Sequence, residues 1–200
     1  MVRYYPLLLD LRGRKCLVVG GGKVAQRKAR SLLKAGASVW IISPNLTKGL
    51  EKLKTSKRVF YIKSGYQKKY LKDAMLVIAA TYDGKINSEI AEDAKNLKVL
   101  ANVVDSPAMS NFIVPSSLSK GDLLISISTN GKAPGLSKRI RKDLSRLLIP
   151  RYAKFLSLLE KLREDLKQRC LEPRLRGLIM NCLVNAKIKT RQAKKKDSRK

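Results

Sequence analysis

The chain has 200 residues, of which 44% are hydrophobic and 30% charged, and none is histidine. This length and composition exclude a disordered chain and are typical of a globular protein with a substantial core. The formal net charge of +29 indicates a polyanionic partner, which could be nucleic acid, an acidic membrane surface or a small polycarboxylate.

The absence of histidine removes the commonest general base and metal ligand, so acid–base chemistry must fall to carboxylates, lysines, tyrosines or water. Cys16, Cys170 and Cys182 lie far apart and form no C-x-x-C pair, and Cys16 is best interpreted as a small buried apolar residue. No apolar run approaches the ~20 residues of a membrane span, and the N-terminal run is too short for a signal peptide. We therefore expect a soluble, cytoplasmic protein without a metal site.

The segment from Lys15 to Ala29 predicts a strand, a glycine turn and a helix. An apolar run over residues 17–19 stops at the three glycines of residues 20–22, and apolar residues then recur at helical spacing up to Gly36. Gly20, Gly22 and Ala25 satisfy the G-x-G-x-x-G/A fingerprint, in which backbone N–H groups and the positive end of a helix receive a pyrophosphate. The sequence therefore predicts a dinucleotide-binding enzyme.

Residues 39–42 predict the next buried strand, which ends at Ser43-Pro44-Asn45. No Asp or Glu follows it to accept a hydrogen bond from a ribose hydroxyl, so the choice between NAD and NADP stays open. Ser43 and Asn45 can still hydrogen-bond a ribose.

Further short apolar runs over residues 59–62, 75–80 and 99–104 predict strands, and residues 46–53 and 86–94 predict helices. Strands alternating with helices predict a doubly wound parallel sheet of the α/β class. Ligands bind such sheets beyond the carboxyl ends of the strands. Four segments are expected at that edge. They are Gly20-Gly21-Gly22-Lys23, Ser43–Asn45, Thr81–Asp83, and Asn102–Asp105.

Asp105 follows the last of these strands on the edge where a nicotinamide ring would lie. In a chain without histidine, a carboxylate there is a sensible proton acceptor. An ordinary turn residue before Pro107 is an equally good interpretation, and both stay open.

After Pro115 the pattern changes to a strand over residues 123–128, a loop over 129–135 and a helix over 136–147. Arg139 and its basic neighbours on this helix are a solvated surface by default, but they can also hold carboxylates. Pro150 and Pro173 are expected to break the chain before two further amphipathic helices. Residues 187–200 read as a disordered basic tail.

Six motifs in one order resemble the precorrin-2 dehydrogenase family, which includes the N-terminal part of siroheme synthases. They are Tyr5–Leu11, Val18–Lys28, Ala79–Thr81 with Asn87, Asn102–Asp105, Phe112 with Pro115, and Ile127–Thr129 before Gly131 and Pro134. The resemblance runs from about Tyr5 to Leu148, roughly three quarters of the chain.

The resemblance implies an NAD-dependent oxidoreductase that oxidises precorrin-2 to sirohydrochlorin in siroheme and modified tetrapyrrole biosynthesis. It implies a homodimer with a Rossmann domain over 1–113, an α+β dimerisation segment over 114–149 and a helical domain over 150–186, ahead of the tail at 187–200. Asp105 matches the family's acid–base aspartate, and Lys23, Val24, Pro44 and Asn45 match its dinucleotide contacts, to which we add Thr81 and Asn102. The substrate is expected to be bound by Ser128, Thr129, Asn130, Gly131 and Lys132 of the loop and by Arg139 of the helix that follows it.

Precorrin-2 carries eight carboxylates, so the basic chain would have a polyanionic partner that is not nucleic acid. Thr129 stands where some fused siroheme synthases carry a serine that can be phosphorylated, and Asn130 stands where glycine is common. Phosphorylation control therefore stays open. The sequence also leaves open secondary iron or cobalt chelation and the downstream pathway. The alternative function is a non-catalytic dinucleotide sensor that uses Gly20 to Ala25 alone. The basic tail, which lacks aromatic residues, would support only non-specific nucleic-acid binding.

Overall fold

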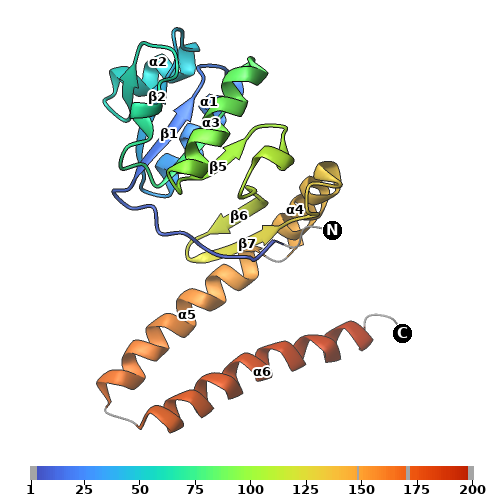
Figure 1. Ribbon diagram of the computed structural model, residues 1–200. Coiled ribbons are helices and arrows are strands. Elements are labelled where there is room, and N and C mark those ends of the chain that lie inside the picture. The colour runs from blue at the N-terminus through green and yellow to red at the C-terminus, as the bar shows by residue number, and fades with distance from the viewer. Residues whose placement is uncertain (1–3, 148, 170–171, 198–200) are drawn as a thin grey trace. The chain divides into compact units, whose positions relative to one another are not determined.

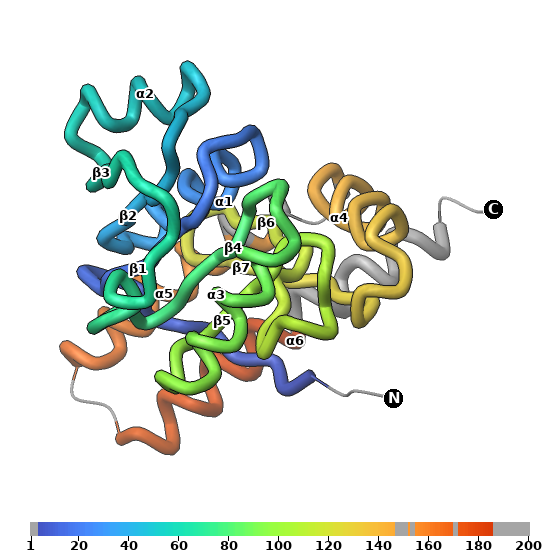
Figure 2. Tube along the Cα trace, turned by 45° about the horizontal axis from the view of Figure 1, so that its top comes forward, coloured from blue at the N-terminus to red at the C-terminus, as the bar shows by residue number. Residues whose placement is uncertain are grey.

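Five short strands form one parallel sheet in the order β3-β2-β1-β4-β5. The computed structural model describes residues 4–147, 149–169 and 172–197. The strands are β1 (Lys15–Val19), β2 (Ser38–Ile42), β3 (Phe60–Ile62), β4 (Leu76–Ala79) and β5 (Leu100–Val103). The chain leaves β1 toward β3, then crosses back to β4 and β5, as Figure 2 shows. The prediction of a parallel α/β sheet is confirmed.

The central strand β1 is buried on both faces because its side chains alternate between two apolar clusters. Cys16 and Val18 face the cluster covered by α1 (Lys23–Lys34) and α2 (Lys48–Thr55). Leu17 and Val19 face the cluster covered by α3 (Gly84–Asn96) and the short turn η1 (Lys68–Leu71). In Figure 1, α3 lies in front of the sheet and α1 behind it. The continuous apolar runs of the sequence therefore mark strands enclosed by helices.

Further contacts hold the two edge strands, β5 and β3, in the sheet. Beside β5, the Asn111 backbone N–H donates to the Ala101 carbonyl at 3.0 Å, and the Asn111 side-chain oxygen accepts from the Ala101 N–H at 2.8 Å. The turn η2 (Pro107–Met109) leads the chain into this contact. At the other edge, Trp40 of β2 stacks on Phe60 of β3, with ring centroids 4.6 Å apart. Trp40 thus packs against the neighbouring edge strand.

The chain divides into two units, Met1–Val114 with Asn130–Lys132, and Pro115–Thr129 with Ala133–Lys200. The second unit contains the antiparallel hairpin of β6 (Ser116–Lys120) and β7 (Leu123–Ile127), then α4 (Pro134–Leu147), α5 (Ile149–Gln168) and α6 (Pro173–Asp197). The helices α4 and α5 contact the hairpin, and α5 contacts α6. This unit therefore joins the two segments, 114–149 and 150–186, for which the sequence suggested separate roles.

Two features of the second unit differ from the sequence interpretation, the strand β6 and the length of α6. The strand β6 was not predicted, because its serines and lysine have weak strand propensity and only its pairing with β7 makes it a strand. The expected breaks at Pro150 and Pro173 are confirmed: each proline lies in the first turn of a new helix, α5 or α6, where its missing N–H would have no partner within the helix. The helix α6 continues to Asp197, since the Lys, Arg, Ala and Gln of the expected basic tail are good helix formers.

Cys16 is fully buried, and burial raises the pKa of its thiol to about 11, so it behaves as an apolar core residue. Cys16 and Cys182 are free thiols. No helix of the described part is both long and apolar enough to cross a lipid bilayer.

Replacing Leu17 with alanine is expected to destabilise the fold by about 2–5 kcal/mol, because Leu17 is fully enclosed in the central strand and its removal leaves a cavity. Urea unfolding of the purified protein measures the change. Leu7→Ala is the matched control: Leu7 is 59% exposed, so its loss should change stability by no more than about 0.5 kcal/mol. Equal effects of both substitutions would contradict the assignment of the core.

Candidate functional site

The glycine turn that follows β1 lies where the chain direction reverses across the sheet, between β2 and β4. The Gly20 N–H donates to the Ile42 carbonyl at 2.9 Å, and the Ala80 N–H donates to the Val19 carbonyl at 2.8 Å. A Cβ atom on Gly20, whose φ is +123°, would overlap the Ala80 carbonyl, and one on Gly21 would overlap the carbonyl oxygen of Asn45. Only glycine therefore fits at these two positions, where the ends of three strands come close together.

The helix α1 begins directly after the turn, and no side chain caps its first N–H groups. Gly22 is its N-cap residue and the first turn carries no acidic residue. By contrast, the Thr47 side chain caps α2 and the Asp83 side chain caps α3. The uncapped N–H donors and the positive helix end make the start of α1 suitable for an anion such as a pyrophosphate.

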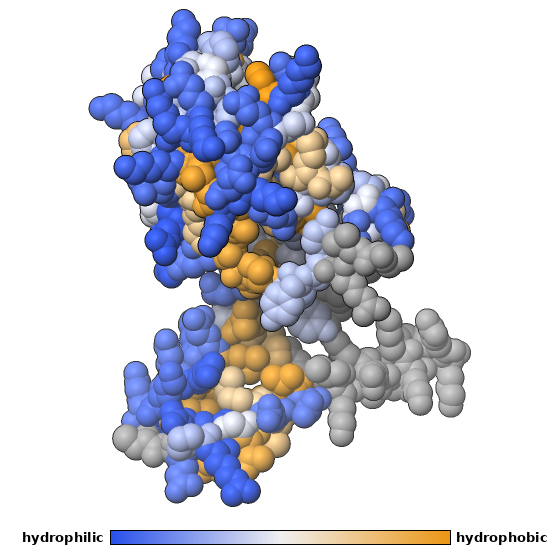
Figure 3. All heavy atoms as spheres, in the orientation of Figure 1, coloured by the Kyte–Doolittle hydropathy of each residue, from blue (hydrophilic) through white to orange (hydrophobic). Residues whose placement is uncertain are grey.

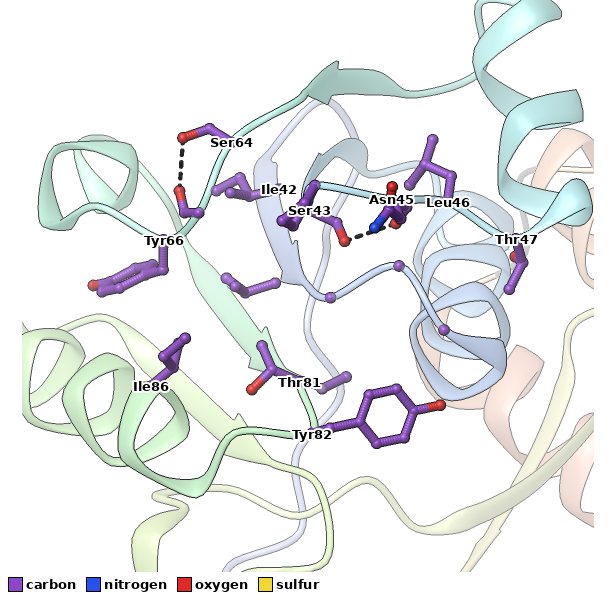
Figure 4. Close-up of a pocket in the computed structure, with 17 residues that line it drawn as sticks. Ile42, Ser43, Asn45, Leu46, Thr47, Ser64, Tyr66, Thr81, Tyr82 and Ile86 are labelled. Carbon is purple, nitrogen blue, oxygen red and sulfur yellow. Dashed lines mark hydrogen bonds between the residues drawn. The ribbon is translucent and has the colours of Figure 1, made fainter.

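A cavity of about 460 Å³ opens at the same place (Figure 4). Its walls come from the glycine turn and from the segments that follow β2, β3 and β4. The lining residues are Val19, Gly20, Gly21, Gly22, Ile42, Ser43, Pro44, Asn45, Leu46, Thr47, Ser64, Gly65, Tyr66, Ala80, Thr81, Tyr82 and Ile86. This is the position at which doubly wound sheets bind dinucleotides.

Seven of the residues predicted to bind the cofactor line this cavity: Gly20, Gly21, Gly22, Ser43, Pro44, Asn45 and Thr81. The Ser43 hydroxyl donates to the Asn45 carbonyl at 2.8 Å, so it holds the loop after β2 in shape. The Thr81 hydroxyl donates to the Asn87 side-chain oxygen at 2.8 Å. These two hydrogen bonds therefore fix the loops that form the cavity wall.

The remaining predicted cofactor residues lie outside the cavity lining. Lys23, Val24 and Ala25 form the first turn of α1, where their backbone rather than their side chains would serve an anion. Ala25 is completely buried against the sheet, which explains the small residue at this fingerprint position. Asn102 is 8% exposed on β5 and hydrogen-bonds Lys28 and the Phe112 carbonyl. Its contact with a cofactor stays a prediction.

The sequence interpretation did not single out Thr47, Ser64 and Tyr66 as part of the cavity. Ser64 and Tyr66 follow the three-residue strand β3, and only the sheet order brings that strand end to the site. The Tyr66 hydroxyl donates to Asp93 at 3.1 Å, and burial together with this carboxylate raises the pKa of Tyr66 well above its usual range. Tyr66 therefore acts as a neutral hydrogen-bond donor that ties the wall to α3.

Tyr82 is the most exposed aromatic side chain at the cavity, at 99%. It extends from the end of β4 toward the start of α1 (Figure 4). A Cβ atom on Gly22 would lie 3.3 Å from its hydroxyl oxygen. The ring therefore borders the surface on which a pyrophosphate would lie.

Asp105 is exposed, just beyond the carboxyl end of β5. Its φ of +61° belongs to the left-handed region, which aspartate and asparagine tolerate better than most residues. The following Ser106 N–H donates to the Val103 carbonyl at 3.2 Å and closes the turn. The position fits a turn residue and an accessible carboxylate at once, so both interpretations of the sequence agree with the geometry.

The predicted substrate loop connects β7 to α4. The Thr129 hydroxyl oxygen accepts from the Ala133 N–H at 3.1 Å and from the Ser137 hydroxyl at 3.2 Å, so it supports the start of α4. Arg139 pairs with Asp143 at 3.3 Å on the exposed surface of α4. Asn130, Gly131 and Lys132 group with the first unit, whereas Ser128, Thr129 and Arg139 belong to the second. Their contact with substrate stays a prediction.

Within the described residues, no group of three or more Cys, Asp or Glu side chains forms a metal-binding cluster.

The chain matches two protein families in adjoining segments. Residues 7–116 match a family of NAD(P)-binding domains, and residues 120–147 match the family described as sirohaem biosynthesis protein central. Together these matches cover the parallel sheet, β7 and α4.

Curated relatives are siroheme synthases. That of Saccharophagus degradans is 37% identical over 92% of this chain, and that of Tolumonas auensis is 40% identical over 83% of it. The matched regions are 42% and 35% of those two proteins, so the chain spans well under half of their length. Among solved structures, the precorrin-2 dehydrogenase SirC is 26% identical, with a TM-score of 0.77 over 90% of this chain and 89% of that one.

Substituting Gly22 with alanine is expected to weaken NAD binding about tenfold or more, because the added methyl group stands between the helix start and the pyrophosphate. The φ of Gly22 is −81°, so alanine should fold normally there. Isothermal titration calorimetry gives the affinity. Gly84→Ala is the control, since a Cβ atom at Gly84 meets no atom within 4 Å, and its affinity should equal that of the wild type.

Proposed function

The chain belongs to the family that unites precorrin-2 dehydrogenases with the N-terminal part of siroheme synthases, and on this premise we propose that it oxidises precorrin-2 to sirohydrochlorin with NAD. The reaction transfers a hydride from the tetrapyrrole to the nicotinamide and releases a proton, which balances two electrons and two hydrogens. The proposal places the chain in siroheme or related tetrapyrrole biosynthesis.

The observation that carries the proposal is the uncapped start of α1 beside a cavity of about 460 Å³ at the reversal point of the sheet. The residues fit a dinucleotide: bare glycines allow close approach, and unpaired helix donors face the place of the pyrophosphate. Asn45 and Thr81 stand at the ends of β2 and β4, on two sides of the cavity. NAD, when bound, supplies the hydride acceptor.

We assign the proton-accepting role to Asp105 by its match to the family motif. Its carboxylate is exposed beyond β5, at the same end of the sheet as the glycine turn. Since the chain contains no histidine, a carboxylate at this edge is a suitable base for the proton that leaves with hydride transfer. In the same proposal, Lys132 and Arg139 bind carboxylates of precorrin-2, for which the net charge of +29 provides a favourable long-range field.

An oxygen-free assay with purified protein, precorrin-2 and NAD tests the reaction. Sirohydrochlorin and NADH should appear in equal amounts, followed by their absorbance. Binding of NAD without turnover or tetrapyrrole binding would instead identify a dinucleotide sensor. A parallel reaction with ferrous or cobaltous ion reports whether the same preparation inserts metal into the product.

Asp105→Asn is expected to lower kcat by about 10²–10⁴-fold, because the amide cannot accept the proton. Asparagine has nearly the same shape and tolerates the left-handed backbone at this position, so the fold and NAD affinity should not change. Stopped-flow measurement of NADH formation gives kcat, and calorimetry gives the affinity. Wild-type turnover by this variant would show that another group accepts the proton.

A homodimer is the assembly that we propose. Residues 114–149, which the sequence assigned to dimerisation, carry the exposed apolar side chains of Leu124 and Leu136, at 44% and 53%. We extend the proposed contact surface to α5 and α6, where Leu158 and Leu178 are each 57% exposed and Figure 3 shows orange side chains along the helices. Exposed apolar groups of this size are typical of surfaces that bind another protein. We also assign the protein to the cytoplasm, with which the free thiols of Cys16 and Cys182 agree.

Light scattering coupled to size exclusion is expected to give twice the 22.4 kDa mass of one chain. A double substitution, Leu158→Lys with Leu178→Lys, should lower the mass toward that of one chain, because two buried ammonium groups oppose an apolar contact. Lys161→Ala with Lys167→Ala on exposed positions of α5 serves as the control and should leave the mass unchanged. A monomeric wild type would refute the proposed dimer.

A further inference from the structure

The side chain of Lys28 on α1 contacts β5. Its ammonium group donates a hydrogen bond to the Asn102 side-chain oxygen at 3.3 Å, although the two residues are 74 positions apart in the chain. Lys28 lies one turn beyond the fingerprint residues of α1 and is half-buried, unlike its exposed neighbours Arg27 and Arg30. This lysine is therefore held in place, whereas most of the chain's basic residues are solvated.

Asn102 presents its oxygen to Lys28 because its other amide atom is already used. The Asn102 nitrogen donates to the Phe112 carbonyl at 3.1 Å, and the side chain is 8% exposed. The carboxyl end of β5 carries Asn102 and, three residues later, Asp105. One fixed amide thus connects the helix that begins at the glycine turn with the strand that leads to the proposed base.

The surroundings of Lys28 are unfavourable for a cation. Burial is the main cause that lowers its pKa, the charge of Arg27 lowers it further, and the carboxylate of Asp105 acts in the opposite direction. Among the residues that the structure describes, no ion pair within 4.0 Å includes Lys28. Burying a cation whose direct partner is a neutral amide costs free energy, and this cost is the reason to look for a functional role of Lys28.

We propose that Lys28 is a positioning residue of the reaction: anchored by Asn102, its ammonium group attracts the Asp105 carboxylate and orients it at the edge of the sheet. The inference rests on the proposed function. Asp105 is otherwise an exposed side chain on a turn, with several rotamers open to it. A nearby fixed cation favours the rotamers that turn the carboxylate toward it, which reduces the entropy lost when the substrate is aligned.

Lys28→Gln replaces the charged ammonium group with a neutral, shorter side chain that still carries N–H donors. We expect kcat for precorrin-2 oxidation to fall about tenfold or more, with the KM for NAD within about twofold of the wild type. Arg30→Gln removes the same charge from an exposed position of the same helix and should leave kcat unchanged. Lys28→Arg keeps the charge and should restore most of the rate. Equal losses from Lys28→Gln and Arg30→Gln would overturn the inference.

The pH profile gives a second readout that a purely structural role would not move. If the ammonium form is needed, kcat declines at alkaline pH, starting below the range of an ordinary lysine because the pKa of Lys28 is lowered. The charged groups that act on Lys28 are Arg27 and Asp105, and Lys28→Arg alters neither. Arginine stays protonated, so this variant should carry the alkaline decline to higher pH. An unchanged alkaline limb in Lys28→Arg would contradict the inference.

A double-substitution cycle shows whether Lys28 acts through Asp105. In the Asp105→Asn background, Lys28→Gln should cause no further loss of kcat, because the carboxylate that it orients is gone. Independent, multiplying losses would overturn the inference while leaving the proposed function intact. Absence of precorrin-2 oxidation by the wild type would instead refute the proposed function itself, so the two failures are distinguishable.

Discussion

The close approach of backbone at the glycine turn is the constraint on which the site depends. Gly20 lies against the Ala80 carbonyl and Gly21 against the Asn45 carbonyl, so the ends of β1, β2 and β4 converge within van der Waals contact. Side chains at these positions would separate the strands. The same convergence leaves the cavity on the outer side of the turn, lined by the segments that follow β2, β3 and β4. The arrangement of the strands and the space for a ligand therefore have the same structural cause.

Helix α1 combines two electrostatic roles along its length. Its first turn lacks a capping side chain, whereas α2 and α3 are capped by Thr47 and Asp83, so the positive end available for an anion is at the cavity. Lys28, one turn further, contacts β5 through Asn102. A single rigid helix thus relates the expected place of the cofactor to the strand that bears Asp105. Rigid support of this kind is what a reaction between two bound molecules needs.

Local patterns predicted the first unit well because the residues of each strand and helix themselves favour the structure that the segment adopts. The apolar runs correctly indicated all five strands of the sheet, and the ends of β1, β2 and β4 correctly indicated seven cavity residues. The second unit was harder to predict. The strand β6 depends on pairing with β7, and α6 continues through the residues that were expected to form a disordered tail. Propensity is a weak guide wherever a neighbour supplies the missing hydrogen bonds.

The sequence by itself determined the strand, glycine turn and helix from Lys15 to Ala29, since strand, turn and helix preferences act between residues a few positions apart. It also indicated the family, through motifs preserved in one order. Only the tertiary structure decided which segments meet the turn. Ser64 and Tyr66 reach the cavity because β3 lies beyond β2 in the sheet, and Lys28 meets Asn102 because α1 packs over strands distant in the chain. Such contacts depend on strand order and helix packing, which no local pattern of residues encodes.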